Sequence, residues 1–163
     1  MLKPVKKNDS EYNMHHEYFH RSNELIEKYG EHSVVLMQVG AFFEIYGLKS
    51  LDSSGDIGYS NIVRLSEVCN LNISEKTTYL DVIEDGENKR RKLVMAGFRD
   101  YTIDKYLSKL TDAGYTAAVY IQQDSNDKKG KKIRVLEQIY SPGTYISYDN
   151  DNSMKLSNNI MCI

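Results

Sequence analysis

The chain has 163 residues, of which 40% are hydrophobic and 27% are charged, and its formal net charge is −2. This size and composition are typical of one soluble globular domain with extensions. The small negative charge excludes a non-specific polycation, so any contact with nucleic acid must use local basic patches.

Cysteine usage and the lack of long apolar runs indicate an intracellular protein. Cys69 and Cys162 fit neither a disulfide framework nor a zinc ribbon. The first residues, MLKPVKKNDS, are basic but are not followed by an apolar segment, so we predict no signal peptide. No apolar run approaches the ~20 residues needed to cross a bilayer. We expect an intracellular protein whose compartment is cytoplasmic, viral or organellar.

The first half of the chain is predicted to form two helices and two strands. Ser10 can cap the first helix and Gly30 can end it, and Gly40 marks a bend between the strands. The predicted elements are a disordered basic start (1–9), a helix (10–29), strands (33–39 and 42–46), a loop (48–60) and a helix (61–70).

The second half is predicted to contain two β-hairpins and one helix. Asp85-Gly86 is a hairpin signal, Thr102 can cap the helix and Gly114 ends it. The predicted elements are strands (72–83 and 90–98), a helix (103–113), strands (116–122 and 133–140), and a polar linker with the truncated first strand of a following domain (149–163). The globular domain should therefore span residues 10–148.

The segment His16-Glu17-Tyr18-Phe19-His20 matches H-E-x-x-H, a zinc-binding pattern, on the first predicted helix. Two histidines four residues apart can bind one zinc, but a catalytic site needs a third protein ligand, and no G-x-x-H follows. We predict a structural or solvated helix face and no metal. A metal-dependent enzyme domain built on this helix remains an alternative.

Two basic clusters lie at the predicted hairpin turns, at 89–92 (KRRK) and 128–134 (KKGKKIR). They are solvated turns, or they contact phosphate or a neighbouring domain. The chain has no G-x-x-x-x-G-K-[ST] motif, and the spacing identifies no Ser-His-Asp set or carboxylate pair. We therefore predict that this chain is not an enzyme.

The stretch VGAFFEIY (39–46) places two adjacent phenylalanines beside a carboxylate. Because strand side chains alternate, Phe42 and Glu44 should share one face and Phe43 should lie on the other. Both rings could be core and Glu44 solvated. Alternatively, an apolar ring at a bend can wedge between base steps in the DNA minor groove, most easily where the DNA is already easy to unstack.

Several motifs in order resemble the N-terminal mismatch-recognition domain of the MutS family. The segment QVGAFFE (38–44) looks like the family's Q/M-x-G-D-F-Y-E motif, and MAGF (95–98) matches M-A-G-[IF]. The segment TIDKYLSKLTDAGY (102–115) matches A-x-x-x-Y-L-x-x-L-x-x-x-G-Y. Gln122, SPGT (141–144) and the closing SNNIM follow in the family's order, so the resemblance runs from about residue 17 to the end.

The chain also departs from the family pattern. Ala41 replaces an aspartate, Arg99 a proline and Ile121 a glutamate, and the loops at 48–60 and 77–92 are long. None of these changes touches the F-x-E pair. The departures indicate a divergent branch, such as a viral or organellar homologue.

The resemblance implies an α+β fold, a mixed β-sheet flanked by about three helices. Phe42 would wedge at a mispaired or unpaired base and Glu44 would accept a hydrogen bond from that base. Exposure of both side chains together would favour this function over an enzyme or a protein-interaction module without DNA binding. Possible phosphate contacts are Arg99, Lys89, Arg90, Arg91, Lys128 and Lys129.

The resemblance also implies properties of a longer protein. The fragment itself should need no cofactor, whereas the full-length protein should bind ATP and Mg in a later domain. Mismatched double-stranded DNA, a second subunit and a MutL-like protein are the expected partners.

Overall fold

One mixed β-sheet runs through the structure, a computed structural model that describes residues 3–4, 14–124 and 132–145. Its strands lie in the order β1-β5-β6-β3-β2-β7-β8, and β4 pairs with β3 outside this path. Only β2 and β7 pair in parallel. The strands are β1 (Lys3–Pro4), β2 (Ser33–Val39), β3 (Phe42–Lys49), β4 (Ile57–Gly58), β5 (Ser74–Glu84), β6 (Glu87–Arg99), β7 (Thr116–Asp124) and β8 (Lys132–Tyr140).

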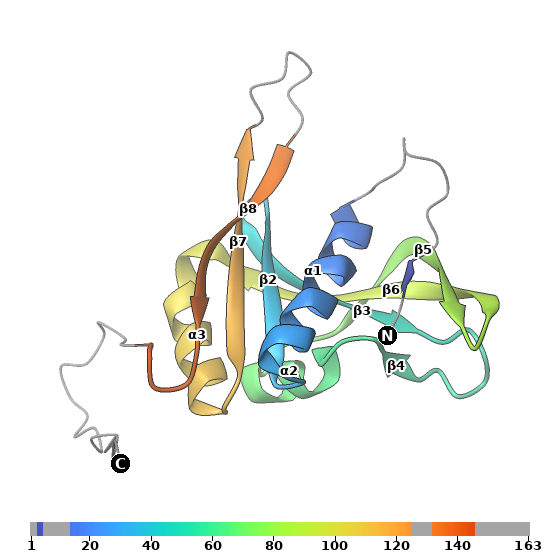
Figure 1. Cartoon of the computed structure of the whole chain (residues 1–163), viewed down its shortest axis with the longest axis horizontal. Helices are drawn as coiled ribbons and strands as arrows, with labels where there is room; N and C mark the ends of the chain where they lie inside the picture. The colour runs from blue at the N-terminus through green and yellow to red at the C-terminus, as the bar shows by residue number, and fades with distance from the viewer. Residues whose placement is uncertain (1–2, 5–13, 125–131, 146–163) are drawn as a thin grey trace.

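Three α-helices in the described residues cover the two faces of the sheet (Figure 1). They are α1 (Met14–Tyr29), α2 (Ile62–Cys69) and α3 (Ile103–Asp112), the last preceded by a short 3₁₀ helix (Asp100–Thr102). On the α1 face, the rings of Tyr18 and Tyr46 meet edge to face at 5.0 Å. On the other face, Phe98 of β6 stacks on Tyr106 of α3 at 4.0 Å. The predicted α+β class, a mixed sheet flanked by three helices, is confirmed.

The central strands are buried on both faces, which explains why their sequences are apolar without a break. Residues Val34, Val35, Leu36 and Met37 of β2 are at most 2% exposed. A strand that is covered on both faces cannot alternate between apolar and polar side chains, because both sets are removed from water. The apolar run SVVLM is therefore a direct consequence of the layered arrangement.

Most predicted element boundaries are confirmed. Helix α1 ends at Tyr29 before Gly30, and its observed start is Met14, whereas the predicted cap Ser10 lies outside the described residues. Strand β3 continues to Lys49, beyond its predicted end, because it pairs with β6 along its whole length. The β5–β6 turn has positive φ at both central residues, Asp85 and Gly86, as the hairpin signal predicted.

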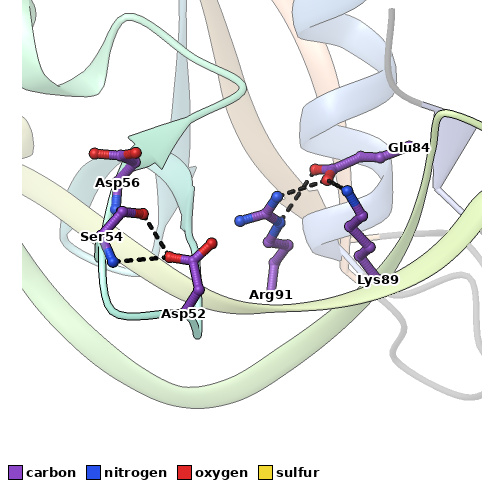
Figure 2. A network of polar contacts seen from close by, with 6 residues as sticks. All are labelled: Asp52, Ser54, Asp56, Glu84, Lys89 and Arg91. Atoms are coloured by element: carbon purple, nitrogen blue, oxygen red, sulfur yellow. Dashed lines mark hydrogen bonds and ion pairs between the residues drawn. The ribbon is translucent and has the colours of Figure 1, made fainter.

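The predicted loop at 48–60 has more structure than expected. Residues Ile57–Gly58 form β4 and pair with the end of β3. Within the loop, the Asp52 carboxylate accepts a hydrogen bond from the Ser54 N–H at 3.0 Å, which closes a local turn (Figure 2). The loop is thus held by its own side chains and by the edge of β3.

The chain start differs from the prediction at Lys3–Pro4, which pairs with Val82 and Ile83 of β5. The edge of β5 offers unpaired backbone groups to this segment, a contact that composition alone does not reveal. The remaining residues of 1–9 and the predicted linker and strand at 149–163 lie outside the described residues. Among the described helices, none has the length and apolar character required to cross a membrane.

The side chains of β3 alternate between the two faces as predicted. Phe43 is 4% exposed and shares its face with Phe98, which packs on α3. Glu44 and Tyr46 point to the opposite face, where α1 lies. Phe42 belongs to that face too, but it stands at the strand end and remains 40% exposed. The two adjacent phenylalanines therefore have different environments.

We predict different stability losses for the two rings. Phe43→Ala should lower the free energy of unfolding by about 3–5 kcal/mol, because it leaves a cavity in the core. Phe42→Ala should have a much smaller effect, because that ring is partly in water already. Urea unfolding of the 163-residue chain measures both values, and equal losses would contradict the assignment of the two faces.

Candidate nucleic-acid interface

A two-residue turn, Gly40-Ala41, connects β2 to β3 and presents Phe42 at the end of the sheet. Val39 pairs with Phe42, so the turn is as short as an antiparallel hairpin allows. Gly40 has φ +61° at the first turn position, which a type II′ turn requires and which a side chain disfavours. The Ala41 carbonyl accepts the Asp100 N–H at 3.0 Å, which ties the turn to the end of β6.

Two glutamines, far apart in the sequence, tie the same turn to the β7–β8 hairpin. Gln122 donates its N–H to the Gln38 side-chain oxygen at 2.9 Å, and its own side-chain oxygen accepts the Gly40 N–H at 3.3 Å. Arg134 of β8 donates to the Gln122 side chain at 3.3 Å and to the Gln38 carbonyl at 3.4 Å. The turn is therefore held from both sides, and Phe42 follows it directly.

The Phe42 ring is in contact with a cation. Phe42 pairs with Arg99 across β3 and β6, and the Arg99 guanidinium carbon lies 5.0 Å from the ring centroid. Such a cation–π contact contributes ~0.5–1 kcal/mol at an exposed site. Arg99 stands where the family pattern has proline, which carries no charge. The cation–π contact therefore exists in this chain because it departs from the family pattern at this position. The ring is held, yet it remains accessible.

The Glu44 carboxylate is largely buried, which differs from the expectation that it would be exposed beside Phe42. The residue is 8% exposed, and it is Phe42 alone that is exposed. The Tyr46 hydroxyl donates a hydrogen bond to Glu44 Oε2, and the Lys76 ammonium lies 3.7 Å from the same oxygen. Burial, followed by the bond to Glu44, raises the pKa of Tyr46 far above its usual value, so this hydroxyl stays a donor.

A glycine makes room for this arrangement. Glu44 pairs with Gly97 of β6, where an added Cβ would lie 2.8 Å from the Phe43 carbonyl oxygen and 3.5 Å from Glu44 Cγ. A contact of 2.8 Å to backbone cannot be relieved by rotating a side chain. The glycine of the MAGF segment is therefore required by the close approach of β3 and β6.

Cationic and aromatic groups complete the surroundings of the carboxylate. The His15 ring of α1 meets the Tyr46 ring edge to face at 5.0 Å. Burial, followed by the nearby Lys76, His16 and Arg134, lowers the pKa of His15 to about 4. At neutral pH the imidazole is neutral, so the positive charge at this end of the sheet comes from lysine and arginine.

Comparison with known proteins gives a consistent result. Residues 19–149 match the family model described as MutS domain I. The chain belongs to this family. It is 32% identical over 136 residues to a mitochondrial DNA mismatch repair protein mutS homolog of Sarcophyton glaucum, covering 77% of the chain and 13% of that protein.

Other relatives of this MutS domain I include viral and bacterial proteins. A mutS homolog of Acanthamoeba polyphaga mimivirus is 29% identical over 147 residues, covering 90% of the chain and 12% of that protein. The DNA mismatch repair protein MutS of Thermosipho melanesiensis is 27% identical over 131 residues, covering 78% and 13%. The resemblance deduced from motifs is confirmed, and the matched region is a small part of each relative.

The predicted basic residues do not all lie near Phe42 in this MutS domain I. Lys89 and Arg91 contact the Glu84 carboxylate at 3.3 and 2.6 Å (Figure 2), and Arg90 stacks on Tyr79. They belong to the far end of β6, and Arg91 is ~26 Å from Arg99 at about 3.3 Å per residue. Of the predicted phosphate contacts within the described ranges, only Arg99 adjoins Phe42.

Two of the predicted contacts, Lys128 and Lys129, lie outside the described residues. Conversely, sequence reasoning missed Lys76, Tyr46 and His15, and it did not single out Arg134 within its basic cluster. Lys76 reaches Glu44, and Arg134 reaches the backbone beside the turn, from strands that are distant in sequence. Of these four residues, only Arg134 could have been found from the sequence, because it ends a basic cluster at the start of a predicted strand.

The H-E-x-x-H segment lies on α1, as predicted, and two of its polar side chains, Glu17 and His20, contact residues of the same helix. His20 lies 3.4 Å from Glu24, and Glu17 lies 4.0 Å from Arg21. Within the described ranges, no group of three His, Cys, Asp or Glu side chains is placed to hold a metal ion. The geometry gives no support to the enzyme alternative, and the zinc content itself stays a prediction.

We predict that His15 makes stability depend on pH between 5 and 7. Its pKa of about 4 in the folded state lies below the value of ~6.5 for an unfolded chain, so the unfolded state binds an extra proton as the pH falls. The free energy of unfolding should therefore decrease from pH 7 to pH 5, and His15→Gln should reduce that slope. Urea unfolding at several pH values measures it.

The control for this experiment is His20→Gln, which replaces a histidine side chain that is 55% exposed and so tests whether loss of any histidine changes the slope. Glu75, whose pKa is lowered to about 2 mainly by its hydrogen bonds to Lys49 and Lys92, acts at a lower pH and does not interfere. The same slope in the parent chain and in His15→Gln would contradict the prediction.

Proposed function

We propose that this chain is the mismatch-recognition domain of a longer MutS-like DNA repair protein and is not catalytic by itself. Phe42 is the wedge that enters the minor groove at a mispaired or unpaired base, and Glu44 accepts a hydrogen bond from that base. The observation that carries the proposal is an exposed phenylalanine on a fastened two-residue turn, next to a carboxylate, in a chain of the MutS domain I family.

A wedge must be rigid to be effective, and the Gly40-Ala41 turn meets that requirement. Unstacking a base step costs a few kcal/mol, which the contacts of the ring with DNA must offset. A ring on a mobile loop would also have to offset the entropy lost when the loop becomes ordered. Here Gln122 and Asp100 hold the turn before DNA arrives. Damaged or mispaired steps are easier to unstack than matched ones, so a fixed ring can discriminate between them.

The two oxygens of Glu44 have different surroundings, which supports its proposed role. Tyr46 and Lys76 both contact Oε2. Among the described residues, neither a hydrogen bond nor an ion pair engages Oε1. Oε1 is therefore the oxygen available to a donor on an unstacked base, while Oε2 keeps the carboxylate in place.

Phosphate contacts near the wedge would come from a small set of cations. Arg99 and Arg134 lie at the turn, whereas Lys89, Arg90 and Arg91 are distant from it. The latter three could contact DNA only away from the mispair. With a net charge of −2, the isolated chain should bind plain duplex weakly, with a Kd of ~10⁻⁴ M or weaker at physiological salt.

The longer protein is part of the same proposal. The aligned region is only 12–13% of the length of the curated relatives that the chain matches. We propose that later domains of the longer protein bind ATP and Mg. We also propose that this protein acts as a dimer and that a MutL-like protein is its partner.

We predict that Phe42→Ala in the full-length protein abolishes the preference for a mispair. Affinities for a matched duplex, a G·T duplex and a duplex with one unpaired thymine should become similar, because the wedge acts only where bases unstack. Affinity for matched DNA should change little. Fluorescence titrations at fixed salt measure the ratios.

The matched control for the wedge is Tyr79→Ala, because Tyr79 is an aromatic residue of nearly the same exposure (41% against 40%) on β5. It should leave the mismatch-to-match ratio unchanged. The proposal fails if Phe42→Ala retains the ratio of the parent protein, or if Tyr79→Ala loses it to the same extent.

We predict that Glu44→Gln raises affinity for matched DNA and narrows the mismatch-to-match ratio. A carboxylate near phosphates is repelled, and its desolvation is offset only where a base supplies a donor. Matched DNA supplies none, so the charge acts there as a penalty that disfavours the wrong partner. The same titrations test this expectation.

Glu27→Gln is the control, because it removes one negative charge near the C-terminal end of α1. It should raise both affinities slightly and leave their ratio unchanged. Unchanged matched-DNA affinity and an unchanged ratio in Glu44→Gln would show that the Glu44 carboxylate has no part in discrimination.

A further inference from the structure

Lys76 reaches Glu44 because strand β5 is irregular next to the site. The β5–β6 pairing runs through Ser74 and Glu75, shifts, and resumes at Tyr79, so residues 76–78 have no regular partner. A β-bulge of this kind re-aims side chains, often beside functional sites. Since β6 lies between β5 and β3, the Lys76 side chain crosses β6 to contact Glu44 on β3.

The Lys76–Glu44 pair is unequal in exposure. The Glu44 side chain is 10% exposed and the Lys76 side chain 36%, with 3.7 Å between Nζ and Oε2. The carboxylate cannot leave its place without losing the Tyr46 hydroxyl as well, whereas the lysine is free to turn toward solvent. Lys76 is also the one cation recorded in contact with this carboxylate among the described residues.

We propose that Lys76 is a specificity-determining residue, which sets how strongly Glu44 disfavours matched DNA. This inference rests on the proposed function of Glu44. When a duplex offers no donor, the Lys76 ammonium neutralises the carboxylate and reduces its repulsion from phosphates. When a mispaired base donates to Oε1, that bond supplies the compensation, so the lysine matters less.

The proposal predicts an effect that a simple phosphate contact would not produce. Lys76→Met keeps most of the aliphatic stem but removes the charge, so matched DNA should lose more affinity than mismatched DNA. The mismatch-to-match ratio should widen by about three- to tenfold, less than the coupling of close charge pairs at protein interfaces, because the Lys76 side chain is 36% exposed. A phosphate contact alone would weaken both duplexes equally.

The decisive experiment is a double-mutant cycle in the full-length protein, with Lys76→Met made alone and together with Glu44→Gln. In the Glu44→Gln background there is no carboxylate to neutralise, so Lys76→Met should leave the ratio unchanged. Lys76→Arg retains the cation and should restore the ratio of the parent protein. Titrations of matched and G·T duplexes at one salt concentration supply all the values.

A second lysine–glutamate pair provides the control. Lys89 contacts Glu84 at 3.3 Å and its side chain is 40% exposed, which closely resembles Lys76, but the pair is distant from the wedge. Lys89→Met should leave the ratio unchanged. Urea unfolding of each variant separates a folding defect from a binding effect, because a folding defect would lower the active fraction for both duplexes equally.

The outcomes separate this inference from the proposed function. If the parent protein prefers the mispair but Lys76→Met weakens both duplexes equally, the role of Lys76 is overturned and the wedge stands. The role of Lys76 is also overturned if Lys76→Met changes the mismatch-to-match ratio by the same factor in the parent protein and in the Glu44→Gln variant. If the parent protein shows no preference for a mispair, both proposals are overturned.

Discussion

The register between β3 and β6 is the constraint on which the candidate interface depends. It runs without a break from Phe42↔Arg99 to Lys49↔Lys92 and places Gly97 opposite Glu44. Because side chains alternate, a slip of one residue would bury Phe42 and turn Phe43 toward the exposed end. Gly97 reinforces this register, because the close contact of the two backbones there leaves no space for a side chain. The positions of the ring, the cation and the carboxylate all follow from this one pairing.

A buried carboxylate makes the interface a preassembled site. A charge that is 8% exposed is unfavourable unless hydrogen bonds and an opposite charge compensate it. Tyr46 supplies the first and Lys76 the second, both at the same oxygen. The other oxygen, which has no recorded partner among the described residues, is therefore held in a defined direction. This geometry reconciles a largely buried negative charge with a stable fold, because the hydrogen bond and the ion pair compensate the desolvation of the carboxylate.

Two sets of basic residues have different partners in the structure. One group neutralises carboxylates along the β5–β6 hairpin, where Glu84 holds Lys89 and Arg91. The other lies at the Gly40-Ala41 turn, where Arg99 contacts the Phe42 ring and Arg134 contacts amide and carbonyl oxygens. Within the described residues, neither arginine of the second group has a carboxylate partner. Two arginines without a carboxylate partner among the described residues therefore lie at the turn that precedes the exposed phenylalanine.

The sequence by itself determined what depends on local patterns. The helices and hairpins follow from apolar spacing and from turn residues such as Gly40 and Asp85-Gly86, and alternation alone assigned Phe42 and Phe43 to opposite faces. The family's motifs, in order, predicted the mixed sheet. These features need only neighbours along the chain, so a pattern of a few residues contains the information.

Only the tertiary structure decided the environment of the site. Glu44 is buried and contacts Lys76, and Gln38 contacts Gln122 and Arg134. These contacts join residues that lie 32 to 96 positions apart in the chain. The irregularity of β5 that directs Lys76 has no signature in its residues, and the ion pairs of Lys89 and Arg91 were indistinguishable from phosphate contacts in the sequence. Strand order and register bring these groups together, and no local propensity encodes which distant side chain will meet a given charge.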